Sequence, residues 1–365
     1  MFDSTVSRRT FLKGSAAAAS VAAAGSLSLS AWSADRAHAA GGERNVTPSL
    51  CNGCSSKCGL TATTLGGTLF TLNGIEQHPY SKGKLCARGH GFAQMAYNDE
   101  RVTQPLRRTE NGEFEPIDWD TAFREIGEKV KAIVAASGPE SLALIHDPRP
   151  SGKYYTKRFM NALGSANVYT HAAACNLSKE AGLTETIGAS NYSVDFGSCK
   201  MVMFIGRSYG DGIRPSHAMS LADAAEAGTR VVIVDPRLSN AGIFASDWVP
   251  VNPGTDLALL MAVCNVLIEE DLYNRDFVEQ HTVGCEEFAA QAKEYAPEGA
   301  EKICDGPADR IRELARALAK AAPAAAVEAS WRAAFGCAYR NSFDTARAVT
   351  AGHALLGSWG AKGGE

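Results

Sequence analysis

Apolar residues recur along this chain of 365 residues with two different spacings. Between residues 118 and 137 they recur every three or four positions, which predicts an amphipathic helix that Gly138 and Pro139 end. Short unbroken apolar runs, such as MVMFI at 201–205, predict buried strands instead. The predicted elements are a helix at 118–137, a strand at 142–145, a helix at 153–163, strands at 201–205, 231–234 and 248–251, and a helix from Thr255 or Asp256 to Leu267.

Strands that alternate with helices predict a parallel sheet with helices on both faces, which is the doubly wound α/β arrangement. The composition is that of a globular protein, with 45% hydrophobic and 21% charged residues, and the length suffices for two or three packed units. The net charge of −4, without basic and aromatic residues interleaved, does not favour nucleic acid as a partner.

The first 39 residues have the features of an export signal. Residues 7–13 read SRRTFLK, a twin-arginine motif, and a weakly apolar stretch leads to Ala37-His38-Ala39, an A-x-A cleavage site. The alternative is a retained membrane anchor at 14–32, although alanine, serine and glycine make that segment only weakly apolar. The sequence therefore predicts export, to the periplasm or the outer face of the cytoplasmic membrane. Twin-arginine export carries folded proteins, which suits a protein that acquires its cofactor in the cytoplasm.

Four cysteines have the spacing of a metal site. Cys51, Cys54 and Cys58 lie within CNGCSSKC, and Cys86 follows 28 positions after Cys58 in GKLCARG. Three ligands from one loop and a fourth from a distant one favour a [4Fe–4S] cubane over structural zinc, which more often uses two C-x-x-C pairs. Disulfides are the third alternative, since the chain is predicted to be exported.

The cysteine motif, followed by DERV at 99–102 and QPLRR at 104–108, resembles the N-terminal domain of the molybdopterin (bis-guanine dinucleotide) oxidoreductases. The resemblance implies a [4Fe–4S] cluster and a molybdenum bis(molybdopterin guanine dinucleotide) cofactor. It places Arg88 between cluster and pterin, where a guanidinium can hydrogen-bond the pterin edge. An arginine there is typical of the polysulfide and thiosulfate reductases. The alternative for Arg88 is a solvated surface side chain.

The strand ends indicate a nucleotide site. In doubly wound sheets, ligands bind beyond the carboxyl ends of the strands, which places Gly206, Asp235 and Arg237 near a ligand. Asp235 is suited to guanine or a ribose hydroxyl and Arg237 to a phosphate. Gly254 and Asp256 belong to a turn that enters a helix N-terminus, a position that favours phosphate.

The alternative for these strand ends is a purely structural role, but the whole run from 231 to 262 resembles the same family. The segment after the strand at 201–205 departs from the family's pattern. Where the family often has asparagine, this chain has Ser208, whose hydroxyl can still donate to a phosphate. The chain contains neither G-x-G-x-x-G after a strand nor a P-loop, so NAD and P-loop sites lack their defining residues.

Cys175, in THAAACN, aligns with the position of the protein's own molybdenum ligand in the resembled family. A thiolate there would complete a set of pterin sulfurs and leave one site for substrate. The alternative is a buried structural cysteine. His171, four positions earlier, is a candidate proton donor or a structural histidine. The remaining cysteines have no metal spacing and receive no role: Cys199, Cys264, Cys285, Cys304 and Cys337.

The resemblance covers almost all of residues 45–365 and ends in a G-x-x-G-x-K-G-G-like segment. The expected domains are the signal at 1–39, an iron–sulfur domain at 45–105, a first α/β domain from 106–170 plus 326–365, and a second, nucleotide-binding α/β domain at 171–325. Whole catalytic subunits of the family continue into a C-terminal domain that closes over the cofactor, and this chain is expected to be an N-terminal portion without it.

The resemblance implies the catalytic subunit of an exported molybdenum oxidoreductase that reduces polysulfide or thiosulfate. It also implies two partners, of which one is an iron–sulfur electron-transfer subunit, the other a quinol-oxidising membrane anchor subunit. Within the class, the alternatives are tetrathionate or arsenate reduction, formate oxidation and reductive dehydroxylation. Two alternatives outside it are an electron-transfer module that lacks molybdenum chemistry and a zinc-stapled binding protein.

Overall fold

The computed structural model describes residues 42–54, 56–146, 153–211, 214–330 and 332–365. The predicted export signal at 1–39 lies outside the described residues. The chain divides between Arg101 and Val102 into two compact units, each of which is described by itself. No helix in the described ranges is both long and apolar enough to cross a lipid bilayer.

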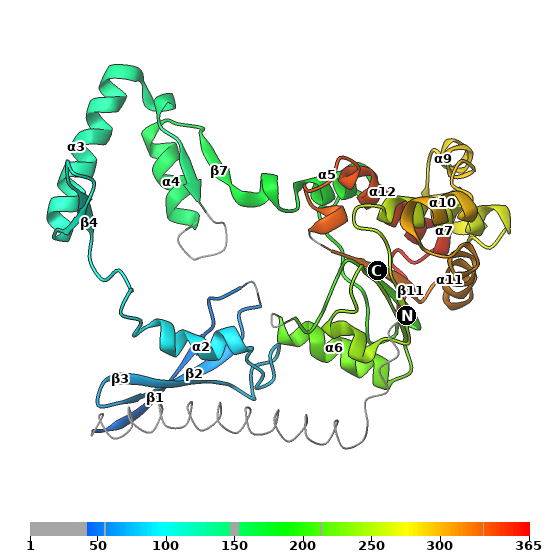
Figure 1. Cartoon of the computed structure of the whole chain (residues 1–365), viewed down its shortest axis with the longest axis horizontal. Helices are drawn as coiled ribbons and strands as arrows, with labels where there is room; N and C mark the ends of the chain where they lie inside the picture. Colours follow the sequence, from blue (N-terminus) through cyan, green and yellow to red (C-terminus); the bar gives the residue numbers. More distant parts are fainter. Residues whose placement is uncertain (1–41, 55, 147–152, 212–213, 331) are drawn as a thin grey trace, which may run out of the picture. The chain divides into compact units, whose positions relative to one another are not determined.

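The first unit is a three-stranded antiparallel sheet with one helix. Strands β1 (Arg44–Leu50), β2 (Gly59–Leu65) and β3 (Thr68–Gly74) pair in chain order, and helix α2 (Ala87–Met95) packs on β3 (Figure 1). Gly66 and Gly67 join β2 to β3 with φ of 54° and 82°, the left-handed conformation that a tight hairpin turn needs. The small core of this unit consists of Cys51, Cys58, Leu60, Leu72 and Ala93.

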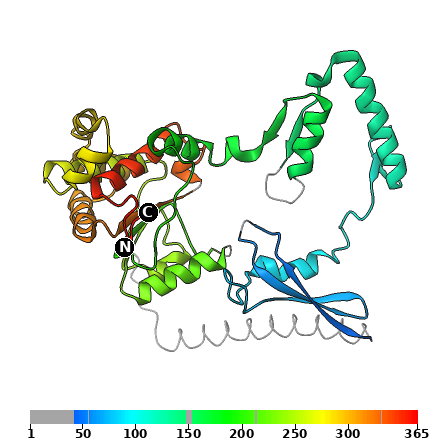
Figure 2. The same ribbon diagram turned by 180° about the vertical axis from the view of Figure 1, so that it is seen from behind.

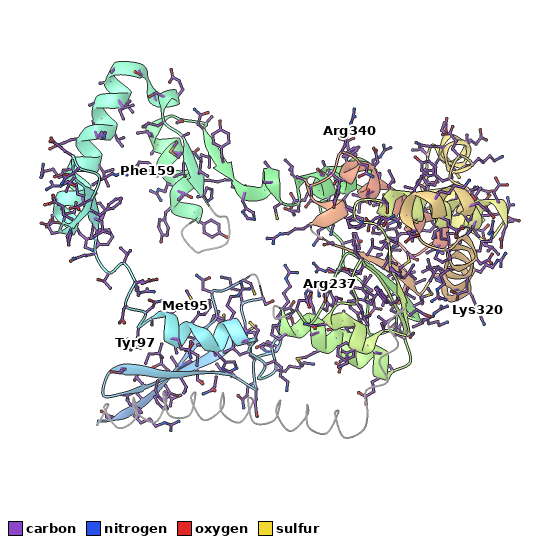
Figure 3. The ribbon with its side chains drawn as sticks, viewed as in Figure 1. Met95, Tyr97, Phe159, Arg237, Lys320 and Arg340 are labelled. Atoms are coloured by element: carbon purple, nitrogen blue, oxygen red, sulfur yellow. The ribbon has the colours of Figure 1, made fainter. Side chains whose placement is uncertain are left out.

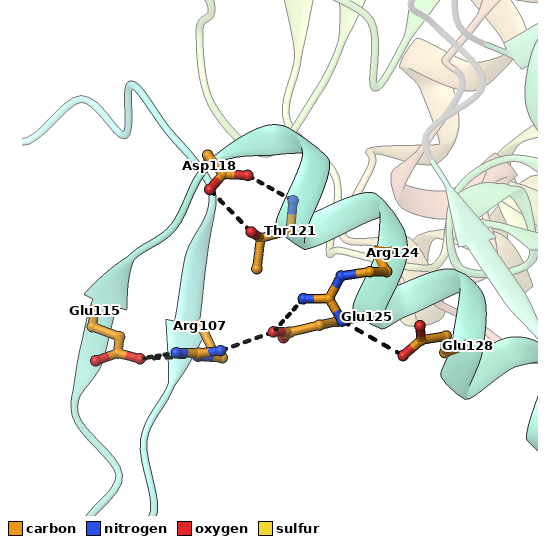
Figure 4. Close-up of polar contacts among 7 residues, drawn as sticks. All are labelled: Arg107, Glu115, Asp118, Thr121, Arg124, Glu125 and Glu128. Atoms are coloured by element: carbon orange, nitrogen blue, oxygen red, sulfur yellow. Dashed lines mark hydrogen bonds and ion pairs between the residues drawn. The ribbon is translucent and has the colours of Figure 1, made fainter.

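The second unit begins with a hairpin and the long amphipathic helix predicted from the sequence. Strands β4 (Leu106–Arg108) and β5 (Phe114–Pro116) precede α3 (Trp119–Ser137). Asp118 caps α3 by accepting the Thr121 N–H at 2.6 Å. Arg107 of β4 bonds both Glu115 of β5 and Glu125 of α3, at 2.6 and 2.8 Å, and so ties the hairpin to the helix (Figure 4).

A second pair of strands follows α3. Strand β6 (Leu144–His146) pairs in parallel with β7 (Val168–Thr170), and α4 (Lys153–Leu163) lies between them in the chain. The predicted helices at 118–137 and 153–163 are confirmed. The strand predicted at 142–145 begins two residues later, because Leu142 caps a short 3₁₀ helix over Pro139–Ser141.

The principal sheet has four parallel strands in the order β10-β9-β8-β11. They are β8 (Met201–Ile205), β9 (Arg230–Val234), β10 (Asp247–Val249) and β11 (Ala325–Ala329). The chain runs outward from β8 to β9 and β10 on one side, and β11 pairs with β8 on the other. The reversal of strand order between β8 and β11 is the topological switch point at which ligands bind in such sheets.

Helices cover both faces of this sheet (Figures 1 and 2). Alternate residues face opposite ways, so Val202, Phe204 and Ile233 pack toward α6, whereas Met203 and Val232 pack toward the larger cluster around α7. The helices of this part are α5 (Leu177–Ile187), α6 (Pro215–Glu226), α7 (Asp256–Glu269), α8 (Arg275–His281), α9 (Cys285–Ala292), α10 (Pro297–Cys304), α11 (Ala308–Ala321) and α12 (Ser342–Leu356).

These observations confirm the predicted fold class, a doubly wound parallel α/β arrangement preceded by a small cysteine-containing domain. One grouping differs from the expectation. Residues 326–365 were expected beside residues 106–170, but β11 pairs with β8, and α12 packs against α5 and α7. A short apolar strand such as AAVEA carries no information about which sheet it joins, so the sequence pattern could not assign it.

Candidate functional site

The four cysteines of the N-terminal motif come together in the first unit. Cys51 and Cys58 are buried, and the Cys51 N–H donates to the Cys58 carbonyl at 2.8 Å, which closes the loop between them. Burial raises the pKa of the Cys58 thiol, and the nearby thiols of Cys54, Cys51 and Cys86 raise it further. Electrostatic coupling of this kind requires proximity, so the fold gathers the four sulfurs that the spacing paired.

The four thiols are free cysteines, and no three His, Cys, Asp or Glu side chains in the described ranges converge tightly enough to hold a single metal ion. A cubane needs a wider arrangement than one zinc ion, because its four iron corners are spread over the cluster. The loose gathering of thiols is therefore a better fit to a cluster than to zinc.

Arg88 lies in the first turn of α2, two residues after Cys86, which is the residue that precedes the helix. Its side chain is exposed. The beginning of α2 thus places a guanidinium close in the chain to the fourth thiol.

Cys175 lies in the second unit, between the 3₁₀ helix His171–Ala174 and the start of α5. It is half-buried and follows β7, whose last residue, Thr170, accepts the Ala172 N–H and so begins the 3₁₀ helix. His171 opens that helix with an exposed side chain. The connection from a strand end to a helix N-terminus therefore presents Cys175.

A second cysteine, Cys337, lies against this segment, although no motif in the sequence marks it. The hydroxyl of Ser178 donates to the Cys337 sulfur at 3.5 Å. Burial by itself raises the pKa of Cys337, but hydrogen bonds from Ser178 and from the backbone of Leu177 and Cys175 outweigh it, so the pKa is lowered. Nothing in the spacing of Cys175 and Cys337, which are 162 positions apart in the sequence, could have indicated this contact.

The strand ends β8 and β9 bring four predicted nucleotide residues together. Gly206 has φ of +57° and donates its N–H to the Val234 carbonyl at 2.9 Å. Asp235 accepts the N–H of Arg237 at 3.0 Å, and the exposed Arg237 side chain bonds Asp211 at 2.6 Å (Figure 3). Ser208 joins the group through Asp211.

The Ser208 hydroxyl is already engaged. Its oxygen accepts the Ala241 N–H at 3.3 Å, and it hydrogen-bonds Asp211. Burial raises the pKa of Asp211, but Arg237 and Ser208 outweigh this and lower it. Asp211 is the residue of this set that the sequence did not indicate. It holds Arg237 and Ser208 in place.

Gly254 and Asp256 form the entry to α7. Gly254 has φ of +83°, and an added Cβ would lie 2.5 Å from the Tyr339 ring, so only glycine fits the turn. Asp256 is the first residue of α7 and is buried. Burial raises its pKa to about 6, and the negative charge of Asp235 adds to the effect. The structure therefore brings Asp256 toward the Asp235 side of the sheet.

A buried charged cluster occupies the switch point, and the sequence did not indicate it. Glu328 of β11 accepts from the Tyr209 hydroxyl at 2.9 Å and pairs with Arg207 at 3.3 Å. Lys179 of α5 is also buried and lies 5.3 Å from the centre of the Tyr192 ring. Burial lowers the pKa of Lys179 to about 8, although the Glu328 carboxylate opposes this. The signal was Glu328 itself, a charge inside an apolar strand, which is tolerated only when it is paired.

Two family models match the chain. The model described as "Molybdopterin oxidoreductase" matches residues 101–356, and "Molybdopterin oxidoreductase Fe4S4 domain" matches residues 44–98. The second match contains all four motif cysteines, and the first contains Cys175 and the strand ends.

Individual relatives agree with these matches. The chain is 33% identical over 365 residues to the thiosulfate reductase molybdopterin-containing subunit PhsA of Salmonella typhimurium, covering 99% of this chain and 47% of the relative. It is 32% identical over 253 residues to a subunit of the sulfite dehydrogenase of Allochromatium vinosum, covering 67% and 26%. The solved structure of acetylene hydratase from Pelobacter acetylenicus superposes with a TM-score of 0.75 at 29% identity, covering 85% of this chain and 43% of that one. The chain spans less than half of the length of each of these proteins.

Proposed function

Because the chain belongs to the molybdopterin oxidoreductase family, we propose that it serves as the catalytic chain of an exported molybdenum enzyme that reduces sulfur compounds of the thiosulfate or polysulfide type. The observation that carries this proposal is the 33% identity, along 99% of this chain, to a subunit of a thiosulfate reductase. The Fe4S4 and molybdopterin domains themselves support a [4Fe–4S] cluster and a molybdenum–pterin cofactor.

The residues fit these groups. We assign the cluster to Cys51, Cys54, Cys58 and Cys86, because these four thiols converge in one small unit whose core contains two of them. Arg88, exposed at the start of α2, would offset the negative charge of a pterin beside the cluster. Its guanidinium would hold the pterin edge by hydrogen bonds.

The second unit offers the donors for the rest of the cofactor, in its bis-guanine dinucleotide form. Cys175 would supply a protein thiolate ligand. The Asp235 carboxylate would accept hydrogen bonds from guanine or ribose, and Arg237 would face a phosphate, as would the helix N-terminus that follows Gly254. Gly206 leaves room for the nucleotide to approach β8, and Ser208 holds Asp211 in position.

When bound, the molybdenum centre supplies two-electron redox chemistry. The reaction expected with thiosulfate takes up two electrons and two protons, breaks the S–S bond, and releases hydrogen sulfide and hydrogen sulfite ions. His171, exposed four residues before Cys175, would carry a proton to the departing sulfur.

Export and partners complete the proposal. The twin-arginine motif supports export to the periplasm or the outer face of the membrane. Two relatives are named as subunits of larger enzymes. By analogy with them, this chain would work with an iron–sulfur subunit, which passes electrons, together with a quinol-oxidising membrane subunit.

Metal content and turnover test the proposal. The chain is purified, with any partner that accompanies it, from its native host. We expect about four irons and one molybdenum per chain, and oxidation of a reduced viologen dye by thiosulfate or polysulfide. Iron without molybdenum would support the electron-transfer module instead. Turnover of tetrathionate, arsenate or formate with inactivity toward thiosulfate and polysulfide would redirect the substrate assignment.

A substitution separates the ligand from the cluster. Cys175→Ala should abolish dye oxidation, by at least about a thousandfold, while the four irons and the brown absorption remain, because the two sites lie in different units. A variant that retains wild-type turnover would contradict the assignment of Cys175.

A further inference from the structure

Two thiols from distant parts of the chain meet at the N-terminus of α5. Cys175 lies two residues before this helix, and Cys337 lies in the loop that follows β11. The Cys337 sulfur contacts the segment around Cys175 on two sides. It accepts from the Ser178 hydroxyl at 3.5 Å and lies 3.9 Å from the Ala172 carbonyl oxygen. Both thiols are free and half-buried, so a reagent in solution can reach them.

The backbones of the two segments are in contact as well. An added Cβ at Gly336 would lie only 2.4 Å from the Cys175 carbonyl oxygen. The residue next to Cys337 is thus pressed against Cys175 itself, and only glycine allows that approach. A disulfide requires this closeness, because its two Cα atoms are usually within about 7 Å of each other.

We propose that Cys175 and Cys337 form a reversible disulfide in the cofactor-free chain, with a small-molecule or protein disulfide as the oxidant. The Cys337 thiolate attacks one sulfur of the oxidant, forms a mixed disulfide and releases the first thiol. Cys175 then attacks the Cys337 sulfur and releases the second thiol. The two cysteines lose two electrons and two protons, and the oxidant is reduced to two thiols.

The other cysteines of the second unit do not share this arrangement. Cys199, Cys264 and Cys304 are buried in the core. Cys285 is half-buried at the start of α9, and no other cysteine occurs among the described residues that line the pocket beside it. The pairing of Cys175 with Cys337 is therefore specific.

The disulfide would have a consequence for the cofactor, and this consequence alone rests on the proposed function. A sulfur that is bonded to Cys337 cannot serve as a thiolate ligand. Cofactor insertion would then require a reduced chain, and a chain that is exported empty would be closed to later metal binding.

Tryptic digestion suits the test because it isolates each thiol. Peptide 159–179 contains Cys175 as its single cysteine, and peptide 333–340 contains Cys337 as its single cysteine. The full chain is prepared without cofactor, reduced, freed of reductant and exposed to oxidised glutathione. Remaining thiols are alkylated before digestion without reductant, and the peptides are identified by mass spectrometry.

We expect a cross-linked pair of peptides 159–179 and 333–340 that disappears on treatment with dithiothreitol. Cys337→Ser should remove the cross-link and leave Cys175 alkylated or carrying glutathione. The matched control Cys285→Ser, which changes another half-buried thiol, should leave the cross-link unchanged. Circular dichroism spectra confirm that both variants fold.

Alkylation of both cysteines in the wild-type chain, or separate glutathione adducts on each, would overturn the proposal. This result is independent of the metal analysis. A chain that forms the cross-link but never binds molybdenum would refute the proposed function and keep the disulfide, whereas a chain that binds molybdenum without ever forming the cross-link would do the reverse.

Discussion

At the scale of single residues, Asp256 shows how the fold strains a charge. The carboxyl group is buried at the start of α7, and burial raises its pKa from 3.8 to about 6, with help from Asp235. The folded chain therefore resists ionisation of this group. At a pH well below 3.8 the group is protonated in both states and costs nothing. As the pH rises toward 6 the unfolded chain ionises first, so stability falls, and the loss is complete above pH 6.

Asp256→Asn should therefore stabilise the cofactor-free chain at neutral pH. A pKa difference of about two units corresponds to about 3 kcal/mol in the free energy of unfolding. We expect the gain in urea denaturation at about pH 7.5 and almost none at about pH 4. Asp309→Asn, at the first turn of α11 with an exposed side chain, is the control and should show no such pH dependence. An equal gain at both pH values would show that the charge of Asp256 is not the cause.

What the sequence could predict at this scale depended on local spacing. Cys51, Cys54 and Cys58 were paired with Cys86 from motif spacing alone, and the fold brings their thiols together. The contact of Cys337 with the Cys175 segment and the pairing of Glu328 with Arg207 were beyond prediction. Each joins residues more than 100 positions apart in the sequence, and only the pairing of β11 with β8 and the packing of the following loop create them.

At the scale of elements, the contact between the loop after β11 and the segment before α5 depends on one glycine. A Cβ at Gly336 would lie 2.4 Å from the Cys175 carbonyl oxygen and 2.9 Å from the Arg332 Cα. Both neighbours are backbone atoms, which cannot rotate away as a side chain can. The loop must move if the residue becomes larger.

Gly336→Ala should therefore destabilise the chain by about 1–3 kcal/mol, the usual cost of overpacking, and separate Cys337 from Cys175. Urea denaturation measures the first effect, and the yield of the cross-linked peptides measures the second. Gly299→Ala is the matched control. Gly299 lies within α10 with open space around it, so alanine there should be neutral or stabilising by up to about 1 kcal/mol. Unchanged stability in Gly336→Ala would show that the loop gives way freely.

Element boundaries followed from periodicity where packing and pattern agree. The helix at 118–137 was predictable because Asp118 and Gly138 mark its ends, and the strand at 201–205 because an unbroken apolar run must be buried. Sheet membership was not predictable. The segment AAVEA at 325–329 joins β8 through backbone hydrogen bonds, which any apolar strand of that length could form.

At the scale of the whole molecule, the chain consists of two units with separate cores. The core of the first unit contains two of the four motif cysteines, so a cluster bound there would be part of its packing. The core of the second unit consists of aliphatic side chains of the sheet and α7. Loss of the cluster should therefore affect one unit and spare the other.

Cys58→Ala in the iron-loaded chain tests this independence by amide hydrogen exchange. We expect exchange in residues 44–98 to rise by roughly tenfold or more, since local stability there depends on the cluster, with no change in β8, β9 or α7. Ser193→Ala, outside the first unit and away from the motif, is the control for the substitution itself. Faster exchange throughout both units would show that they unfold as one.

The pairing of β6 with β7 has a practical consequence for anyone who handles this chain. Ile145 and Tyr169 sit opposite each other on these strands, and their side chains are 81% and 54% exposed. Parallel strands are normally covered on both faces, and uncovered strands with apolar side chains recruit other polypeptides. Solutions of the isolated chain should become turbid on concentration or warming, and light scattering would follow this directly. A charged substitution at position 145 would be the first step toward a sample that keeps.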